Sequence, residues 1–137
     1  MEGDLMKNGS WFEYRVTEEQ SDLCDDKVWK EKYIVASVEG DDIVFDHYRN
    51  DKKLEQVIGN KGYANGIIRT DDLSKIGIER LDTFSGKIDT DAYRSNRCGG
   101  GTEIFVDSRG TMYKSIESQL WSMGVRYSIT RELIEKG

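Results

Sequence analysis

Residues 99–136 read GGGTEIFVDSRGTMYKSIESQLWSMGVRYSITRELIEK. Two turn signals divide this stretch, Asp-Ser-Arg-Gly at 107–110 and Ser-Met-Gly at 122–124. Apolar, β-branched and aromatic residues bounded by Gly, Asp and Ser are typical of strands joined by tight turns. The pattern predicts strands over residues 104–106, 111–121 and 125–135, arranged as an antiparallel meander.

The middle segment of this meander allows a second interpretation. Met112, Ile116 and Leu120 stand four residues apart, a spacing that places them on one face of a strand and also close to one stripe of a helix. Gly124 could cap such a helix at its end. Periodicity alone leaves both alternatives open here.

Turn residues also separate strand-like segments in the rest of the chain. Phe12, Tyr14 and Val16 alternate with charged residues, which is typical of a half-buried strand. The turn at residues 39–41 indicates a hairpin, and Asn65-Gly66 indicates another, because a type I′ turn needs positive φ at both positions. Strands are expected over residues 11–16, 28–38, 42–49, 54–58 and 76–84 and from residue 87 onward, and residues 17–27 are expected to form a connection with at most a short helix.

These elements predict a mainly β protein with one domain over residues 1–137. We expect an antiparallel meander curled into an open half-barrel, with at most one or two short helices. Apolar residues occur in both phases of segment 28–38, and the apolar phase changes between Ile78 and Leu81. The first feature predicts either a strand covered on both faces or a phase shift by a β-bulge, and the second indicates a β-bulge.

Composition narrows the classes of partner. The 137 residues carry 26 Asp and Glu against 20 Lys and Arg, a net charge of −6, which opposes binding to nucleic acid or anionic membranes. No apolar run is long enough for a membrane span. If Met1 is the native start we expect a cytoplasmic protein, and if the chain is trimmed from a longer one, an extracytoplasmic protein. Cys24 and Cys98 favour two unpaired thiols over a disulfide.

Several short motifs follow one another in a recognisable order. Residues 9–16 read Gly-Ser-Trp-Phe-Glu-Tyr-Arg-Val, and the last eight read Thr-Arg-Glu-Leu-Ile-Glu-Lys-Gly. Between them come residues 38–44, 81–86 with 91–93, and 103–107 with Gly110 and Lys114. This order resembles a loosely defined group of archaeal and bacterial envelope-associated domains of unknown function, whose half-barrel is similar to the lipoprotein-carrier family. The resemblance implies an open antiparallel barrel in which residues 112–121 form a strand, although the chain shows no clear helices for the lid that carriers place over their cavity.

The sequence contains no recognisable catalytic or metal-binding motif. His47 is the one histidine, no nucleophile motif accompanies it, and we interpret it as a packed or rim residue. Asp89-Thr-Asp91 begins like a calcium loop, but the sixth position is Arg94 instead of glycine. The Asp doublets, including Asp71-Asp72, are interpreted as turn residues. We therefore expect no enzyme activity, no metal and no cofactor.

Charged residues interrupt two apolar rows. Arg131 shares a strand phase with Tyr127, and Glu31 falls between Trp29 and Tyr33. If these rows face the interior, the charges lie inside the half-barrel or at its mouth, where an unpartnered charge is costly. Either bulges turn them outward, or they pair structurally, or they meet a ligand. The last alternative predicts a ligand site formed by Arg131, Glu31, Trp29, Tyr33, Phe45 and Tyr127, with Arg131 on an anionic head.

Two functions are compatible with these observations. The first is a non-catalytic β domain that binds an apolar or amphipathic small molecule, such as a lipid-like compound. The alternative is a protein-interaction or structural module with a self-filled core, which meets a protein partner or forms a homodimer through an open edge strand or exposed aromatic residues.

Overall fold

A computed structural model describes residues 6–20, 26–95, 100–120 and 126–137. Within these ranges the chain forms strands, turns and loops, and contains no helix that could span a membrane. The strands are β1 (Trp11–Gln20), β2 (Lys27–Glu39), β3 (Asp42–Arg49), β4 (Lys52–Lys53), β5 (Val57–Asn60), β6 (Leu73–Thr83), β7 (Gly86–Ser95), β8 (Gly100–Val106), β9 (Met112–Leu120) and β10 (Arg126–Lys136).

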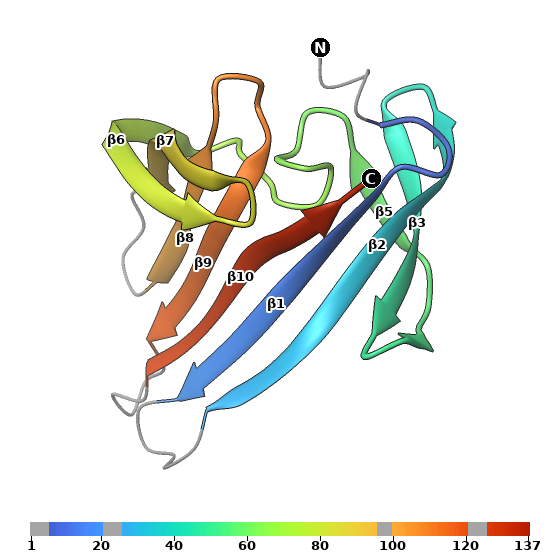
Figure 1. Cartoon of the computed structure of the whole chain (residues 1–137), viewed down its shortest axis with the longest axis horizontal. Helices are drawn as coiled ribbons and strands as arrows, with labels where there is room; N and C mark the ends of the chain where they lie inside the picture. Colours follow the sequence, from blue (N-terminus) through green and yellow to red (C-terminus); the bar gives the residue numbers. More distant parts are fainter. Residues whose placement is uncertain (1–5, 21–25, 96–99, 121–125) are drawn as a thin grey trace.

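All ten strands belong to one antiparallel sheet. Its order is β4-β3-β2-β1-β10-β9-β8-β7-β6, with β5 also paired to β3. The last strand therefore lies between the first strand and β9, as Figure 1 shows in red, blue and orange. The sheet is strongly twisted but does not close into a barrel, so β6 stays an edge. The predicted mainly β, open antiparallel architecture is confirmed.

The predicted terminal meander is confirmed as β8, β9 and β10. Strand β9 is paired on one side with β8 and on the other with β10, and Ile116 lies opposite both Glu103 and Thr130. Its backbone groups therefore bond to neighbouring strands, and the helical interpretation of residues 112–120 is wrong. The second turn of the meander, residues 122–124, lies outside the described residues.

Several predicted boundaries differ from the observed ones. Strand β1 does not end at residue 16 but continues to Gln20, because residues 17–20 still pair with β10, so no helix begins at Thr17. The predicted strand 54–58 is replaced by β4 and β5 on either side of residues 54–56. One expected bulge occurs in β2 between Val35 and Ser37, whereas the bulge in β6 falls between Lys75 and Gly77 and not between residues 78 and 81.

The Asn65-Gly66 pair adopts the expected positive φ angles, 48° and 77°. The turn nevertheless joins no two strands and is flanked by a single bridge, Ala64 to Ile68. It belongs to a segment, residues 61–72, that lies against one face of the sheet. Long-range contacts of this segment with the sheet replace the predicted local hairpin.

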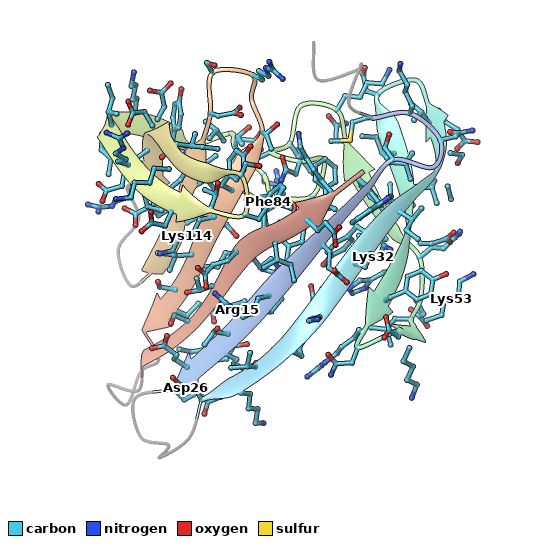
Figure 2. The ribbon with its side chains drawn as sticks, viewed as in Figure 1. Arg15, Asp26, Lys32, Lys53, Phe84 and Lys114 are labelled. Atoms are coloured by element: carbon cyan, nitrogen blue, oxygen red, sulfur yellow. The ribbon has the colours of Figure 1, made fainter. Side chains whose placement is uncertain are left out.

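The two faces of the sheet differ in character. We call the face that carries Tyr14, Glu31 and Arg131 the inner face, and the one that carries Arg15 and Lys32 the outer face. Figure 2 shows the last two on the side turned to the viewer, whereas the green segment between β5 and β6 lies behind the sheet in Figure 1. Most of the core lies between the inner face and this segment, and its fully buried side chains include Tyr14, Val16, Val35, Ile43, Phe45 and Met112.

Residues 61–72, which we call the covering segment, are attached to the sheet through Asn65. The Asn65 side chain lies 4% exposed, donates one hydrogen bond to the Tyr14 hydroxyl at 2.7 Å and a second to the Met112 carbonyl at 2.7 Å, and accepts one from the Met112 N–H at 2.8 Å. Beside it, Gly66 approaches the ring of Phe45 so closely that a Cβ atom would lie 2.8 Å from Cζ. The segment is therefore held at a defined position over the inner face.

Candidate functional site

A buried carboxylate, Glu31 of β2, lies on the inner face with only 7% of the residue exposed. Trp29 Nε1 donates a hydrogen bond to its Oε2 at 2.8 Å, and the Tyr33 hydroxyl donates one to its Oε1 at 2.7 Å. These three residues alternate along β2, so their side chains share one face. Burial on its own would raise the pKa of Glu31, but these hydrogen bonds and the charge of Arg131 outweigh it and lower the pKa. Glu31 is held as a buried anion.

Arg131 connects this anion with a second one. Its Nη1 donates a hydrogen bond to Glu117 Oε1 of β9 at 2.8 Å, and its Nε lies 3.6 Å from Glu31 Oε1. The guanidinium is 16% exposed and Glu117 is 44% exposed, so Glu117 is the member of the network that faces solvent. Burial acts to lower the pKa of Arg131, but Tyr33 and the two carboxylates together raise it. One cation thus lies between two anions.

Aromatic side chains surround this network. The rings of Tyr33 and His47 are stacked, with centroids 4.5 Å apart and planes 9° from parallel. His47 Nε2 lies 3.7 Å from Glu31 Oε1, and the Arg49 guanidinium covers the Trp29 ring at 4.0 Å. Burial and the adjacent Glu31 carboxylate raise the pKa of Tyr33 well above its ordinary value. Its phenol therefore stays a hydrogen-bond donor to Glu31.

A pocket of about 480 Å³ opens between the covering segment and this network. We call it the Arg131 pocket. Apolar side chains of Val57, Ile67 and Ile68 form one part of its wall with Tyr33. Arg131, Glu117 and Thr102 line its floor, and Arg69, Asp71 and Asp72 line its rim. Its volume falls in the range of small-molecule sites, and its wall combines apolar and charged parts.

The charges around the Arg131 pocket are predominantly negative. Three carboxylates and two guanidinium groups line it, and Glu31 adds a further carboxylate behind Arg131. Arg131 is bonded to Glu117, and Arg69 to Asp71 at 2.9 Å. Both guanidinium groups that line the pocket are therefore already paired with carboxylates.

The six residues predicted as a ligand site occupy four different environments. Arg131 and Tyr33 line the Arg131 pocket, and Glu31 and Trp29 belong to the hydrogen-bonded network beside it. Phe45 is fully buried in the core, where its ring packs edge-on against Tyr33 at 6.0 Å. Tyr127 donates a hydrogen bond to Glu18 at 2.9 Å and does not line the pocket.

Sequence reasoning missed Glu117 and the residues of the covering segment that line the pocket. The Asp71-Asp72 doublet was interpreted as turn chemistry alone, yet both residues line the rim. No local signal pointed to Glu117, because the apolar residues Met112, Ile116 and Leu120 stand in the opposite phase of the same strand. His47 is packed against Tyr33, as predicted for it. Cys24 and Cys98 lie outside the described residues.

Comparisons with known proteins add one fold similarity. No protein-family model matches the chain, and no curated protein matches it in sequence. Among solved structures, the complex of MucA and MucB from Pseudomonas aeruginosa is similar, at 14% sequence identity and a TM-score of 0.47. The match covers 95% of this chain and 52% of that chain, so the chain spans about half of its length. A similarity at this level carries no argument about function, and the resemblance to lipoprotein carriers is not confirmed.

Proposed function

We propose that this protein is a non-catalytic binding domain that takes up an amphipathic small molecule in the Arg131 pocket. The observation that carries the proposal is the combination of a wall of Val57, Ile67 and Ile68 with a floor of charged side chains in a cavity of about 480 Å³. A mostly preformed cavity with one apolar side and a few convergent polar groups suits such a ligand. The network around Glu31 supports it, because hydrogen bonds hold the charged side chains beside the cavity at fixed positions.

We propose that the ligand has a cationic headgroup, because carboxylates outnumber guanidinium groups around the pocket. Arg131 alone suggests an anionic headgroup. Arg131 is already bonded to Glu117 and lies close to Glu31, so an anion would have to displace one of them. An ammonium group placed beside Glu117 would instead meet a partly exposed carboxylate in a negatively charged surrounding. The proposed ligand is therefore a primary amine with an apolar chain.

Octylamine and octanoate, used below their micelle-forming concentrations, form a matched pair of probes for this proposal. Titration of the ¹⁵N-labelled protein with octylamine is expected to give saturable amide shifts at Ile67, Ile68 and Thr102. Glu117→Gln should weaken octylamine binding at least about fivefold, which corresponds to about 1 kcal/mol. Glu132→Gln, on the outer face, is the control and should leave the affinity unchanged. Absence of saturable shifts at the pocket, or equal binding by Glu117→Gln, would reject the proposal.

A second candidate function is contact with another protein along β6. This strand is an eleven-residue edge whose Ile76 and Ile78 are 50% and 69% exposed. A long edge strand with exposed apolar residues offers unpaired backbone groups to another strand. Native mass spectrometry tests this candidate, which predicts a dimer or a bound protein that Ile78→Lys removes. A monomer at all concentrations, with no co-purifying protein, would reject it.

A further inference from the structure

A second cavity lies on the other side of the covering segment, where this segment faces β7 and β8. Its volume is about 480 Å³, and we call it the Lys61 pocket. Leu73, Tyr93, Ile104 and Val106 supply its apolar lining from three neighbouring strands of the sheet. Leu73, Tyr93 and Val106 are only partly buried, although they pack against the core. Apolar side chains from adjacent strands thus meet at an opening and remain incompletely covered.

The rim of this pocket has a charge opposite to that of the Arg131 pocket. Lys61 is the one charged residue among the described residues that line it, and the remaining polar rim comes from Tyr63 and Thr70. Asp41 and Asp42 belong to the neighbouring β2–β3 turn, but within the described part of the chain no carboxylate lies within 4.0 Å of the Lys61 ammonium. Among the residues that the structure describes, none therefore neutralises the cation at this opening through an ion pair.

The wall that carries Lys61 is held in place by hydrogen bonds. The Lys61 N–H donates to the Asp41 carbonyl at 2.8 Å, and the Gly62 N–H donates to Asn60 Oδ1 at 2.9 Å. The Thr70 hydroxyl donates to the Gly62 carbonyl at 3.1 Å, which ties the two ends of the segment together. Because the wall of the cavity is already ordered, binding of a ligand loses little conformational entropy of the protein.

From these observations we infer that the Lys61 pocket binds a carboxylate with an apolar chain, such as a medium-chain fatty acid. The chain would lie against Leu73, Tyr93 and Val106, and the carboxylate would pair with Lys61. Charge complementarity selects this ligand, because an amine would bring a second cation beside the Lys61 ammonium at the opening. The inference concerns a site separate from the Arg131 pocket and does not depend on the function proposed there.

The matched probes octanoate and octylamine test the inference on the intact chain. Octanoate is expected to produce saturable amide shifts at Tyr63, Leu73, Tyr93 and Val106 and to bind there at least about fivefold more tightly than octylamine. Lys61→Gln should remove this preference, whereas the control Lys87→Gln, at an exposed position of β7, should retain it. Val106→Phe, which fills the opening from a partly exposed position, should abolish binding of octanoate without changing the octylamine shifts at Ile67 and Ile68.

Three outcomes would overturn the inference. They are shifts that do not saturate, an unchanged preference for octanoate in Lys61→Gln, and concentration-dependent association that covers the same amides in the absence of any probe. The last outcome would assign this face to a second copy of the chain. Because the Arg131 pocket is followed by the octylamine shifts at Ile67, Ile68 and Thr102, failure at one pocket is distinguishable from failure at the other.

Discussion

Asn65 pairs with Met112 as another strand would, because its side-chain amide bonds both backbone groups of that residue although 47 positions separate the two in sequence. Asn65→Ala would leave the Met112 N–H and carbonyl buried without partners. We expect a loss of about 2–4 kcal/mol in the free energy of unfolding, since each buried unsatisfied group costs about 1–3 kcal/mol. Urea denaturation followed by tryptophan fluorescence measures this loss.

Asn50→Ala is the matched control for this prediction. Asn50 has the same φ angle as Asn65, 48°, but its side chain only accepts an exposed hydrogen bond from the Lys30 N–H. The cost of positive φ is therefore shared by both variants, and the difference between them measures the buried hydrogen bonds. Equal destabilisation by the two substitutions would contradict the role assigned to Asn65.

The buried Glu31 is expected to make stability depend on pH in the acid range. Its pKa is lower in the folded state than the value of about 4.3 in an unfolded chain. The unfolded state then binds more protons, so this contribution is present above the unfolded pKa and is lost as pH falls through the folded pKa. Glu31→Gln should be less stable than wild type by about 2 kcal/mol at pH 7, since hydrogen bonds to a charged group are worth about 1.5–3 kcal/mol.

Urea denaturation of wild type and Glu31→Gln between pH 7 and pH 3 measures this dependence. The difference in unfolding free energy between the two proteins should shrink as the pH falls. A constant difference across the range would show that Glu31 is not a buried anion in the folded protein.

Arg131 is expected to stabilise the folded protein because its charge compensates the buried Glu31 carboxylate. Arg131→Met leaves the Glu31 carboxylate buried without its cation, and breaking one side of a buried ion pair costs about 3–5 kcal/mol. The double variant Arg131→Met with Glu31→Gln should recover at least about 1 kcal/mol relative to the sum of the single losses, because neither charge then remains unpaired. Thermal and urea denaturation of the four proteins complete the double-mutant cycle.

The exposed pair Arg15–Glu132 on the outer face provides the comparison for this cycle. Its atoms lie 3.1 Å apart, with side chains 53% and 39% exposed. Arg15→Met should cost less than about 1 kcal/mol, as is usual for surface pairs. If Arg131→Met were as mild as Arg15→Met, the buried network would not stabilise the inner face.

Glycine is required at position 66 for two reasons: the backbone has a positive φ angle there, and the ring of Phe45 leaves no room for a side chain. Its φ is +77°, and a Cβ atom would lie 2.8 Å from Phe45 Cζ, whereas Gly40 has a φ of +63° and nothing within 4 Å of its Cβ position. Gly40→Ala should therefore cost about 1–2 kcal/mol for the left-handed conformation alone. Gly66→Ala should cost a further 1–3 kcal/mol or so from overpacking against Phe45. Thermal denaturation compares the two, and a Gly66→Ala variant no less stable than Gly40→Ala would contradict this.

Local patterns predicted most of the strands. The alternation in β1, the turn at residues 39–41 and the turn signals of the terminal meander were sufficient to identify the all-β architecture, because these signals depend on residues close in sequence. The extension of β1 to Gln20 was not predictable in this way. It follows from pairing with β10, whose strand begins more than one hundred residues later.

The candidate site was only partly predictable. The phases of β2 and β10 left open whether Glu31 and Arg131 face inward or are turned outward by bulges, and the structure places both on the inner face. Tyr127 shares the phase of Arg131, yet it bonds Glu18 outside the pocket, because four residues along a strand separate the two positions by about 13 Å. Phase identifies a face of the sheet but not a position on it.

By itself the sequence determined the all-β class, most of the strand-forming segments and several of their turns, since these depend on backbone preferences and on a period of two. Only the tertiary structure decided that Glu117 pairs with Arg131, that Asn65 bonds Met112, and that the segment 61–72 separates two pockets of opposite charge. These relationships join strands and loops far apart in the chain. Strand register and packing across the sheet decide which residues meet, and neither can be inferred from a short stretch of sequence.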